Sequence, residues 1–105
     1  MSFRVCVVGC GSLSTKAHGP SLRRYADAHA GVVLAACCDL DAVKAETYRG
    51  RFGFERAYTD MEEMLRVERP AAVCLYAPVD RTCPLGCRIL ELGFPLLTEK
   101  PPGLD

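Results

Sequence analysis

The sequence lacks several features that would point to particular classes of protein. It has no tryptophan, and its 13 basic and 13 acidic side chains give a formal net charge of zero. Nucleic-acid-binding domains usually carry a basic excess, so we expect no nucleic-acid partner. All apolar runs are far shorter than the roughly 20 residues that span a bilayer, so we expect no membrane insertion. No signal peptide is recognisable at the start, and we expect a cytoplasmic protein.

Cysteine, in contrast, is abundant, with seven residues. Because this number is odd, and because Cys6, Cys37 and Cys74 lie in apolar runs, we interpret the cysteines as reduced thiols rather than a disulfide framework. Cys83 and Cys87 are four residues apart, so they share a helix face and have a spacing that allows metal ligation. No second pair or histidine lies at zinc-ligand spacing, so we predict no metal site and expect these two side chains to pack against the protein.

Apolar runs of strand length alternate with segments of helical spacing. The predicted strands are Phe3–Val8, Val32–Cys38, Ala72–Ala77 and Pro95–Thr98, with a short further strand within Glu55–Thr59. This alternation predicts an α/β protein with a doubly wound parallel sheet of about five strands and helices on both faces. The continuous apolar runs are typical of strands that are buried on both faces. We expect Tyr25, Tyr48 and Phe52 of the intervening helices to pack against the sheet.

Residues with strong preferences for helix ends mark the predicted helices. Asp41 is a predicted N-cap, and Gly53 is a natural C-terminal stop for the same helix. Asp80 is predicted to cap a later helix, and Pro84 is then expected in its first turn. After the first strand, Gly19-Pro20 interrupts the helical spacing, so the first helix either bends or restarts there.

The segment directly after the first strand, Gly9–Ser14, has the pattern G-x-G-x-x-S. In such a segment the first glycine permits a sharp turn, the second lets a phosphate approach the backbone, and the third position needs a small residue. The free amides at the start of the helix then face a pyrophosphate group. A tight turn without any ligand is the alternative interpretation. The predicted cofactor-binding residues of this segment are Gly9, Cys10, Gly11, Ser12 and Leu13.

Asp39 follows the second predicted strand, where a carboxylate can accept hydrogen bonds from ribose hydroxyls and repel the additional phosphate of NADP. Its distance from Gly11 exceeds the usual spacing of about 20 residues, which a long or interrupted first helix allows. The alternative is that Asp39 only caps the next helix, a role that suits Asp41 better. We therefore predict NAD as the cofactor, with NADP possible.

Further residues follow the third and fourth long strands at the same edge of the sheet. Ligands of open parallel sheets lie over the carboxyl ends of the strands, so we expect Tyr76, Ala77 and Pro78 near the cofactor. Glu99 and Lys100 follow the last strand, and a lysine there can donate a proton or a hydrogen bond to a substrate oxygen during hydride transfer. The alternatives are a proline that merely ends a strand and a solvated pair of surface charges.

Taken in order, these motifs resemble the N-terminal domain of the glucose–fructose oxidoreductase / inositol dehydrogenase / rhizopine catabolism (Gfo/Idh/MocA) family. The resemblance is carried by Gly9-Cys10-Gly11, Asp39, Ala77-Pro78 and, above all, Glu99-Lys100-Pro101. It implies a Rossmann domain over residues 1–105, with Lys100 as the catalytic residue and Glu99 in the cofactor pocket. It also implies a second α/β domain, which is absent here, so we expect this domain to be truncated at its C-terminal end and inactive alone. Thr82 departs from the family, which commonly has histidine at that position.

The resemblance implies an NAD(P)-dependent oxidoreductase that transfers a hydride to or from a hydroxyl or carbonyl group of a sugar, cyclitol or similar small molecule. Unpaired sheet surfaces lead us to expect a homo-oligomer. One alternative is a non-catalytic nucleotide-binding sensor or partner subunit. A minor alternative is an S-adenosylmethionine-dependent methyltransferase, which has a similar glycine loop and acid but does not account for Glu99-Lys100-Pro101.

Overall fold

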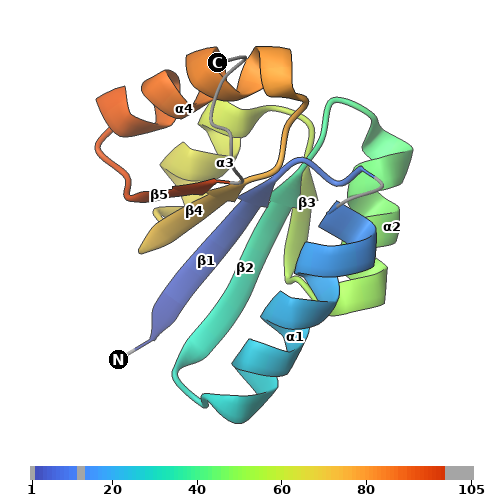
Figure 1. Ribbon diagram of the computed structural model, residues 1–105. Coiled ribbons are helices and arrows are strands. Elements are labelled where there is room, and N and C mark those ends of the chain that lie inside the picture. Colours follow the sequence, from blue (N-terminus) through green and yellow to red (C-terminus); the bar gives the residue numbers. More distant parts are fainter. Residues whose placement is uncertain (1, 12–13, 99–105) are drawn as a thin grey trace.

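The computed structural model describes residues 2–11 and 14–98, and it contains a parallel sheet with helices on both faces (Figure 1). The strands are β1 (Phe3–Val8), β2 (Val32–Cys38), β3 (Arg56–Tyr58), β4 (Ala72–Leu75) and β5 (Leu96–Thr98). Their order across the sheet is β3-β2-β1-β4-β5, so the chain winds outward from β1 to one edge and then returns to the other. The predicted doubly wound sheet is therefore confirmed.

The helices cover both faces of the sheet. They are η1 (Ser14–His18), which is a π-helical turn, α1 (Gly19–Ala28), α2 (Ala42–Phe52), α3 (Met61–Glu68) and α4 (Val79–Glu91). In Figure 1, α1 and α2 cover one face, while α3 and α4 cover the other. The helix after β1 restarts as expected, with Pro20 in the first turn of α1, where a missing amide hydrogen does not break a helical bond.

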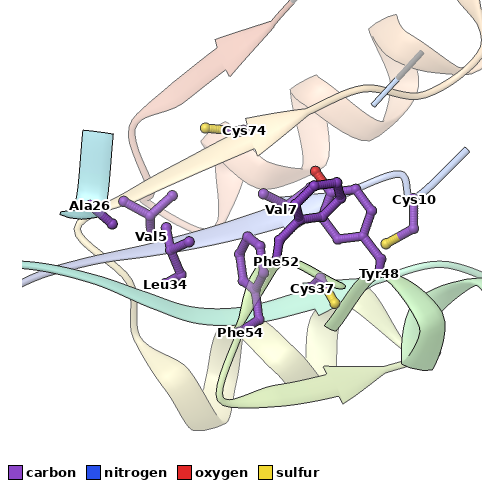
Figure 2. Packing of buried hydrophobic residues seen from close by; sticks show 10 residues of the cluster. All are labelled: Val5, Val7, Cys10, Ala26, Leu34, Cys37, Tyr48, Phe52, Phe54 and Cys74. Atoms are coloured by element: carbon purple, nitrogen blue, oxygen red, sulfur yellow. The ribbon is translucent and has the colours of Figure 1, made fainter. Parts of the chain in front are cut away.

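The side chains of β1 alternate between two layers of the core. Val5 and Val7 pack under α1 and α2 with the aromatic residues Tyr48, Phe52 and Phe54 (Figure 2). The other layer, under α3 and α4, is mainly aliphatic and sulfur-containing. Its buried members are Cys6, Val8, Ala35, Ala36, Cys38, Met64, Leu65, Val73, Leu75 and Ile89. Burial on both sides explains why the strands read as continuous apolar runs.

Two of the expected aromatic contacts with the sheet are present, and one is not. Tyr48 and Phe52 of α2 are buried in the core. Tyr25 of α1 is 54% exposed and instead stacks on His29, with 4.0 Å between the ring centroids. The interrupted start of α1 sets the helical phase, and this phase turns Tyr25 outward while Ala26 faces the core.

The ends of α2 follow their predicted signals. The Asp41 carboxylate accepts hydrogen bonds from the amides of Val43 and Lys44, and so satisfies donors that the first helical turn leaves free. Gly53 closes the helix in the left-handed conformation, at φ 74°.

The start of α4 differs from the prediction. The helix begins at Val79 after Pro78, so Asp80 lies inside the first turn rather than at the N-cap, and Pro84 is an interior residue. Pro78, at φ −54° and ψ 151°, directly precedes α4, and Tyr76 and Ala77 separate it from β4. The buried Thr82 hydroxyl donates to the carbonyl oxygens of Ala77, at 3.3 Å, and Pro78, at 3.1 Å. The Pro78 carbonyl also accepts from the backbone amides of Arg81, at 2.9 Å, and Thr82, at 3.1 Å, so the helical hydrogen bonds begin at Pro78, before Asp80.

Candidate functional site

One row of paired residues crosses all five strands near their carboxyl ends. Tyr58 pairs with Cys38, Cys38 with Val8, Val8 with Leu75, and Leu75 with Thr98. Neighbouring strands of a sheet are about 4.8 Å apart, so segments that follow this row emerge side by side at one edge.

Each predicted site segment begins directly after that row. Gly9 follows β1, Asp39 follows β2, and Tyr76 follows the last residue of β4. The amide of Tyr76 still donates to the carbonyl of Val8, at 2.7 Å, which holds the end of β4 against the glycine turn. The predicted site residues that lie outside the described part of the chain are Ser12, Leu13, Glu99 and Lys100.

Gly9 is required by the packing of the backbone. Its φ of +104° lies in a region that side chains disfavour, and an added Cβ would lie 2.4 Å from the carbonyl oxygen of Tyr76. Its amide donates to the carbonyl of Cys38, at 2.8 Å. The first glycine of the motif therefore lies tightly between β2 and β4, and contact with a ligand is not needed to explain it.

Gly11 has different surroundings. A Cβ added there would meet nothing within 4 Å in the described part of the chain. Open space in front of a glycine backbone is what a closely approaching phosphate needs. The amides of Gly9 and Cys10 already donate within the protein, to the Cys38 carbonyl and the Asp39 carboxylate, so neither is free to bind a phosphate.

Asp39 is held in place by the glycine turn. One carboxylate oxygen, Oδ2, accepts from the Cys10 amide at 2.9 Å, and Oδ1 accepts from the Asp41 amide at 2.9 Å. A carboxylate offers about four lone-pair sites, so two amides leave acceptor capacity on this partly exposed group. Asp41, not Asp39, caps α2, as the sequence predicted. Ribose binding by Asp39 stays a prediction.

Ser14 occupies the third position of the motif, where a small residue is needed. Ser14 is 1% exposed, and its hydroxyl donates to the Tyr48 hydroxyl oxygen at 2.8 Å. Serine therefore provides both the small size that the packing needs and a polar partner for a buried tyrosine, whose pKa is raised by burial.

Cys10 is buried beside Cys37 and Tyr48 (Figure 2). A hydrogen bond with the Cys37 thiol is the main cause that raises the Cys10 pKa, and burial adds to it. A thiol that stays protonated is a poor nucleophile. Cys10 therefore packs in the core, and its backbone amide donates to Asp39. Its thiol is not activated as a nucleophile.

An aromatic stack beside the glycine turn was not predicted from the sequence. The rings of His18 and Tyr76 are 4.0 Å apart and nearly parallel, with an interplanar angle of 7°. His18 is the last residue of η1. The π-helical turn sets the direction of this side chain, and no residue pattern signals such a turn.

Elsewhere on the surface, a hollow of about 540 Å³ lies between α3 and the region that follows α4. None of the predicted site residues lines this hollow. Its lining residues are Asp60, Glu62, Glu63, Leu65, Arg66, Arg69, Leu92 and Phe94. In the described part of the chain, no helix has the length and apolar character needed to cross a membrane.

Comparisons with known proteins agree with this geometry. A model of the oxidoreductase family with an NAD-binding Rossmann fold matches residues 3–105. Myo-inositol 2-dehydrogenase from Lactobacillus plantarum is similar in structure, with a TM-score of 0.83 and 28% identity over 100% of this chain and 30% of that one. A search of curated proteins finds no match.

Two further solved structures contain bound dinucleotides. The WlbA dehydrogenase from Chromobacterium violaceum, in complex with NADH and UDP-GlcNAcA, has a TM-score of 0.86 and 27% identity over 99% of this chain and 29% of that one. A 3-ketoreductase from Actinomadura kijaniata, in complex with NADP and TDP-benzene, has a TM-score of 0.83 and 25% identity over 100% of this chain and 31% of that one. The chain thus spans about a third of the length of these proteins.

Proposed function

We propose, since the chain belongs to the oxidoreductase family with an NAD-binding Rossmann fold, that it binds NAD(H) across the carboxyl ends of β1, β2 and β4 as the cofactor-binding part of a dehydrogenase. The observation that carries this proposal is the open backbone at Gly11 next to the partly exposed carboxylate of Asp39. When bound, the cofactor supplies or accepts a hydride.

The residues of the site have distinct roles in this proposal. Gly11, with Ser12 and Leu13, binds the pyrophosphate through backbone amides. Asp39 accepts hydrogen bonds from the adenosine ribose and disfavours a 2′-phosphate, so NAD is preferred to NADP. Gly9 and Cys10 act indirectly, because their amides bind Cys38 and Asp39 and so fix the geometry of the turn.

A second group of proposed site residues follows β4 and β5 in the sequence. Ala77 and Pro78 flank the cofactor, and Glu99 belongs to its pocket. Lys100 is the proposed catalytic residue, because an ammonium group beside the reacting carbon can hydrogen-bond the substrate oxygen and move a proton at that atom. The support for Glu99 and Lys100 is their position in the sequence directly after Thr98, the β5 member of the row that aligns the site segments.

The proposed substrate is a hydroxyl- or carbonyl-bearing small molecule such as a sugar or cyclitol. Support comes from the similar proteins, which include an inositol dehydrogenase and enzymes bound to nucleotide-linked ligands. We also propose that the protein is cytoplasmic. We further propose that it self-associates, because the edge strands β3 and β5 each lack a neighbouring strand on one side in the described residues.

The cofactor preference can be tested by isothermal titration calorimetry with NAD and NADP. Replacing Asp39 with Ser removes the carboxylate that interacts with the ribose, and we expect the ratio of NAD to NADP affinity to fall by about tenfold, which corresponds to about 1.4 kcal/mol. The matched control is Asp41→Ser, which removes a charge two residues away but keeps a side chain that can cap α2. The control should retain the wild-type ratio.

An unchanged ratio in the Asp39→Ser variant, with the control behaving as expected, would count against the ribose assignment. Titration with S-adenosylmethionine in the same series addresses the methyltransferase alternative. Heat of binding with that compound and none with either dinucleotide would overturn the proposed function.

A further inference from the structure

Two of the seven cysteines lie on the surface, contrary to the packing expected from the sequence. Cys83 and Cys87 are exposed, one helical turn apart, on α4. The side of the helix that carries Thr82 and Ile89 is buried instead. The five buried cysteines are Cys6, Cys10, Cys37, Cys38 and Cys74. Packing therefore accounts for five thiols and leaves this pair unexplained.

The spacing of the pair suits a bridge through one intervening atom. Side chains four residues apart on a helix have Cβ atoms about 5–6 Å apart, whereas a disulfide needs about 3.5–4.5 Å. A direct S–S bond would therefore distort α4. Bonds from sulfur to a metal are longer, about 2.3 Å for zinc, and two such bonds span a wider gap. Cys83 and Cys87 are both exposed on α4, so a reagent can reach both sulfur atoms from solvent.

We propose that Cys83 and Cys87 form a dithiol site for a thiophilic centre that needs only two protein sulfurs, such as trivalent arsenic bearing one organic substituent. Thiolates are soft ligands and select soft partners. Within residues 2–11 and 14–98, no group of three or more His, Cys, Asp or Glu side chains is placed to hold a metal ion. A closed four-ligand zinc site is therefore not an alternative in this part of the chain.

The binding step with phenylarsine oxide is balanced without any oxidant or reductant. Two S–H bonds break, two As–S bonds form, and the arsenic-bound oxygen leaves with both protons as water. Arsenic stays trivalent throughout. Burial shields Cys6 and Cys38 and raises their pKa to about 12. The neighbouring Cys83 thiol raises the pKa of Cys87 as well, so it is exposure that makes the pair at Cys83 and Cys87 react first.

The test is intact-protein mass spectrometry after exposure to phenylarsine oxide and then to an excess of a monothiol. Two protein sulfurs hold arsenic against monothiol exchange, whereas a single sulfur does not. We expect the wild-type chain to retain one phenylarsenic group, and Cys83→Ser and Cys87→Ser to lose it. A matched control combines Cys87→Ser with Leu90→Cys at an exposed position, which keeps two surface thiols but separates them by about 10.5 Å along the helix.

That control should also lose the arsenic group. Retention by a single variant or by the separated pair, or no retention by the wild type, overturns the proposal. A second measurement uses the wild type alone and so does not require any variant to fold. After arsenic binding, alkylation followed by peptide mapping should show Cys83 and Cys87 protected, and alkylation of both would equally contradict the assignment.

Discussion

Glu68 and Asp39 are two carboxylates at opposite ends of the sheet, and they differ in how many hydrogen bonds they accept from the protein. Glu68 has no acceptor capacity left for a ligand, whereas Asp39 does. Glu68, whose side chain is 1% exposed, accepts from Arg4 at 2.6 Å, from Arg56 at 2.5 and 3.0 Å, and from the Tyr58 hydroxyl at 2.6 Å. These four hydrogen bonds occupy all of the roughly four lone-pair sites of a carboxylate.

Asp39, in contrast, accepts two hydrogen bonds from the described residues 2–11 and 14–98, both donated by backbone amides. Its remaining acceptor capacity lies at the edge where the site segments emerge. In this fold, the number of hydrogen bonds that a carboxylate already accepts, more than its charge, distinguishes a structural acid from a candidate ligand-binding acid. Glu68 joins β1, β3 and α3, and it lies outside the candidate site.

Gly9 and Gly11 show the same contrast between a structural role and a ligand-binding role, and we expect the largest loss of stability when Gly9 is replaced. Gly9→Ala combines strain at φ +104° with a contact of 2.4 Å to the backbone of Tyr76, and should lower the free energy of unfolding by about 4 kcal/mol. Gly11→Ala meets open space and should leave stability within about 0.5 kcal/mol while weakening NAD binding. Urea unfolding and calorimetry measure both quantities, and equal stability losses in the two variants would refute the distinction.

Removing the saturated carboxylate should have the next largest effect. Glu68→Gln leaves two guanidinium groups without their shared anion, and we expect a loss of about 3 kcal/mol in urea unfolding, at the lower end for buried ion pairs because both arginines are partly exposed. The control is Glu62→Gln, which breaks an exposed pair with Arg88 and should cost about 0.5 kcal/mol. NAD affinity should be unchanged in both variants. Similar losses of stability in the two variants would show that Glu68, with its partners Arg4, Arg56 and Tyr58, stabilises the fold no more than an exposed ion pair does.

Acid should reveal the same carboxylate through its pKa. Hydrogen bonds from Arg56 above all, and from Tyr58 and Arg4, lower the pKa of Glu68 from 4.5 to about 2. Because the folded-state pKa lies below the unfolded one, the stabilisation is present above about pH 4.5 and is lost as the pH falls toward 2. The stability difference between wild type and Glu68→Gln should therefore narrow over that window. A difference that stays constant with pH would contradict the assignment.

Much of the fold is readable from local patterns. The bounds of β1 and β2 match the apolar runs, since burial on both faces leaves an unbroken signal. Asp41 and Gly53 mark the ends of α2 through local backbone chemistry. The start of α4 differs from the prediction because the Pro78 carbonyl accepts the first helical hydrogen bonds, from the amides of Arg81 and Thr82, and no side chain caps this helix.

The candidate site is predictable in its positions but not in its interactions. The places of Gly9, Gly11 and Asp39 follow from strand ends in a parallel sheet. Their contacts depend on register, which brings the Cys10 amide to a carboxylate 29 residues away. The Glu68 cluster, with its bond to Arg4 across 64 residues, has no local signal at all. The exposure of Cys83 and Cys87 likewise follows from the phase of α4 and not from their residue type.

The proposed binding mode places the dinucleotide at the edge that holds Asp39 and away from the edge that holds Glu68. NMR titration of the labelled chain with NAD tests this directly, through the backbone amide signals. We predict that the signals of Gly11, Asp39 and Ala77 shift with NAD, while those of Arg4 and Glu68 stay in place. Shifts that concentrate around Glu68 or along the hollow beside α3, with the glycine turn unaffected, would contradict it.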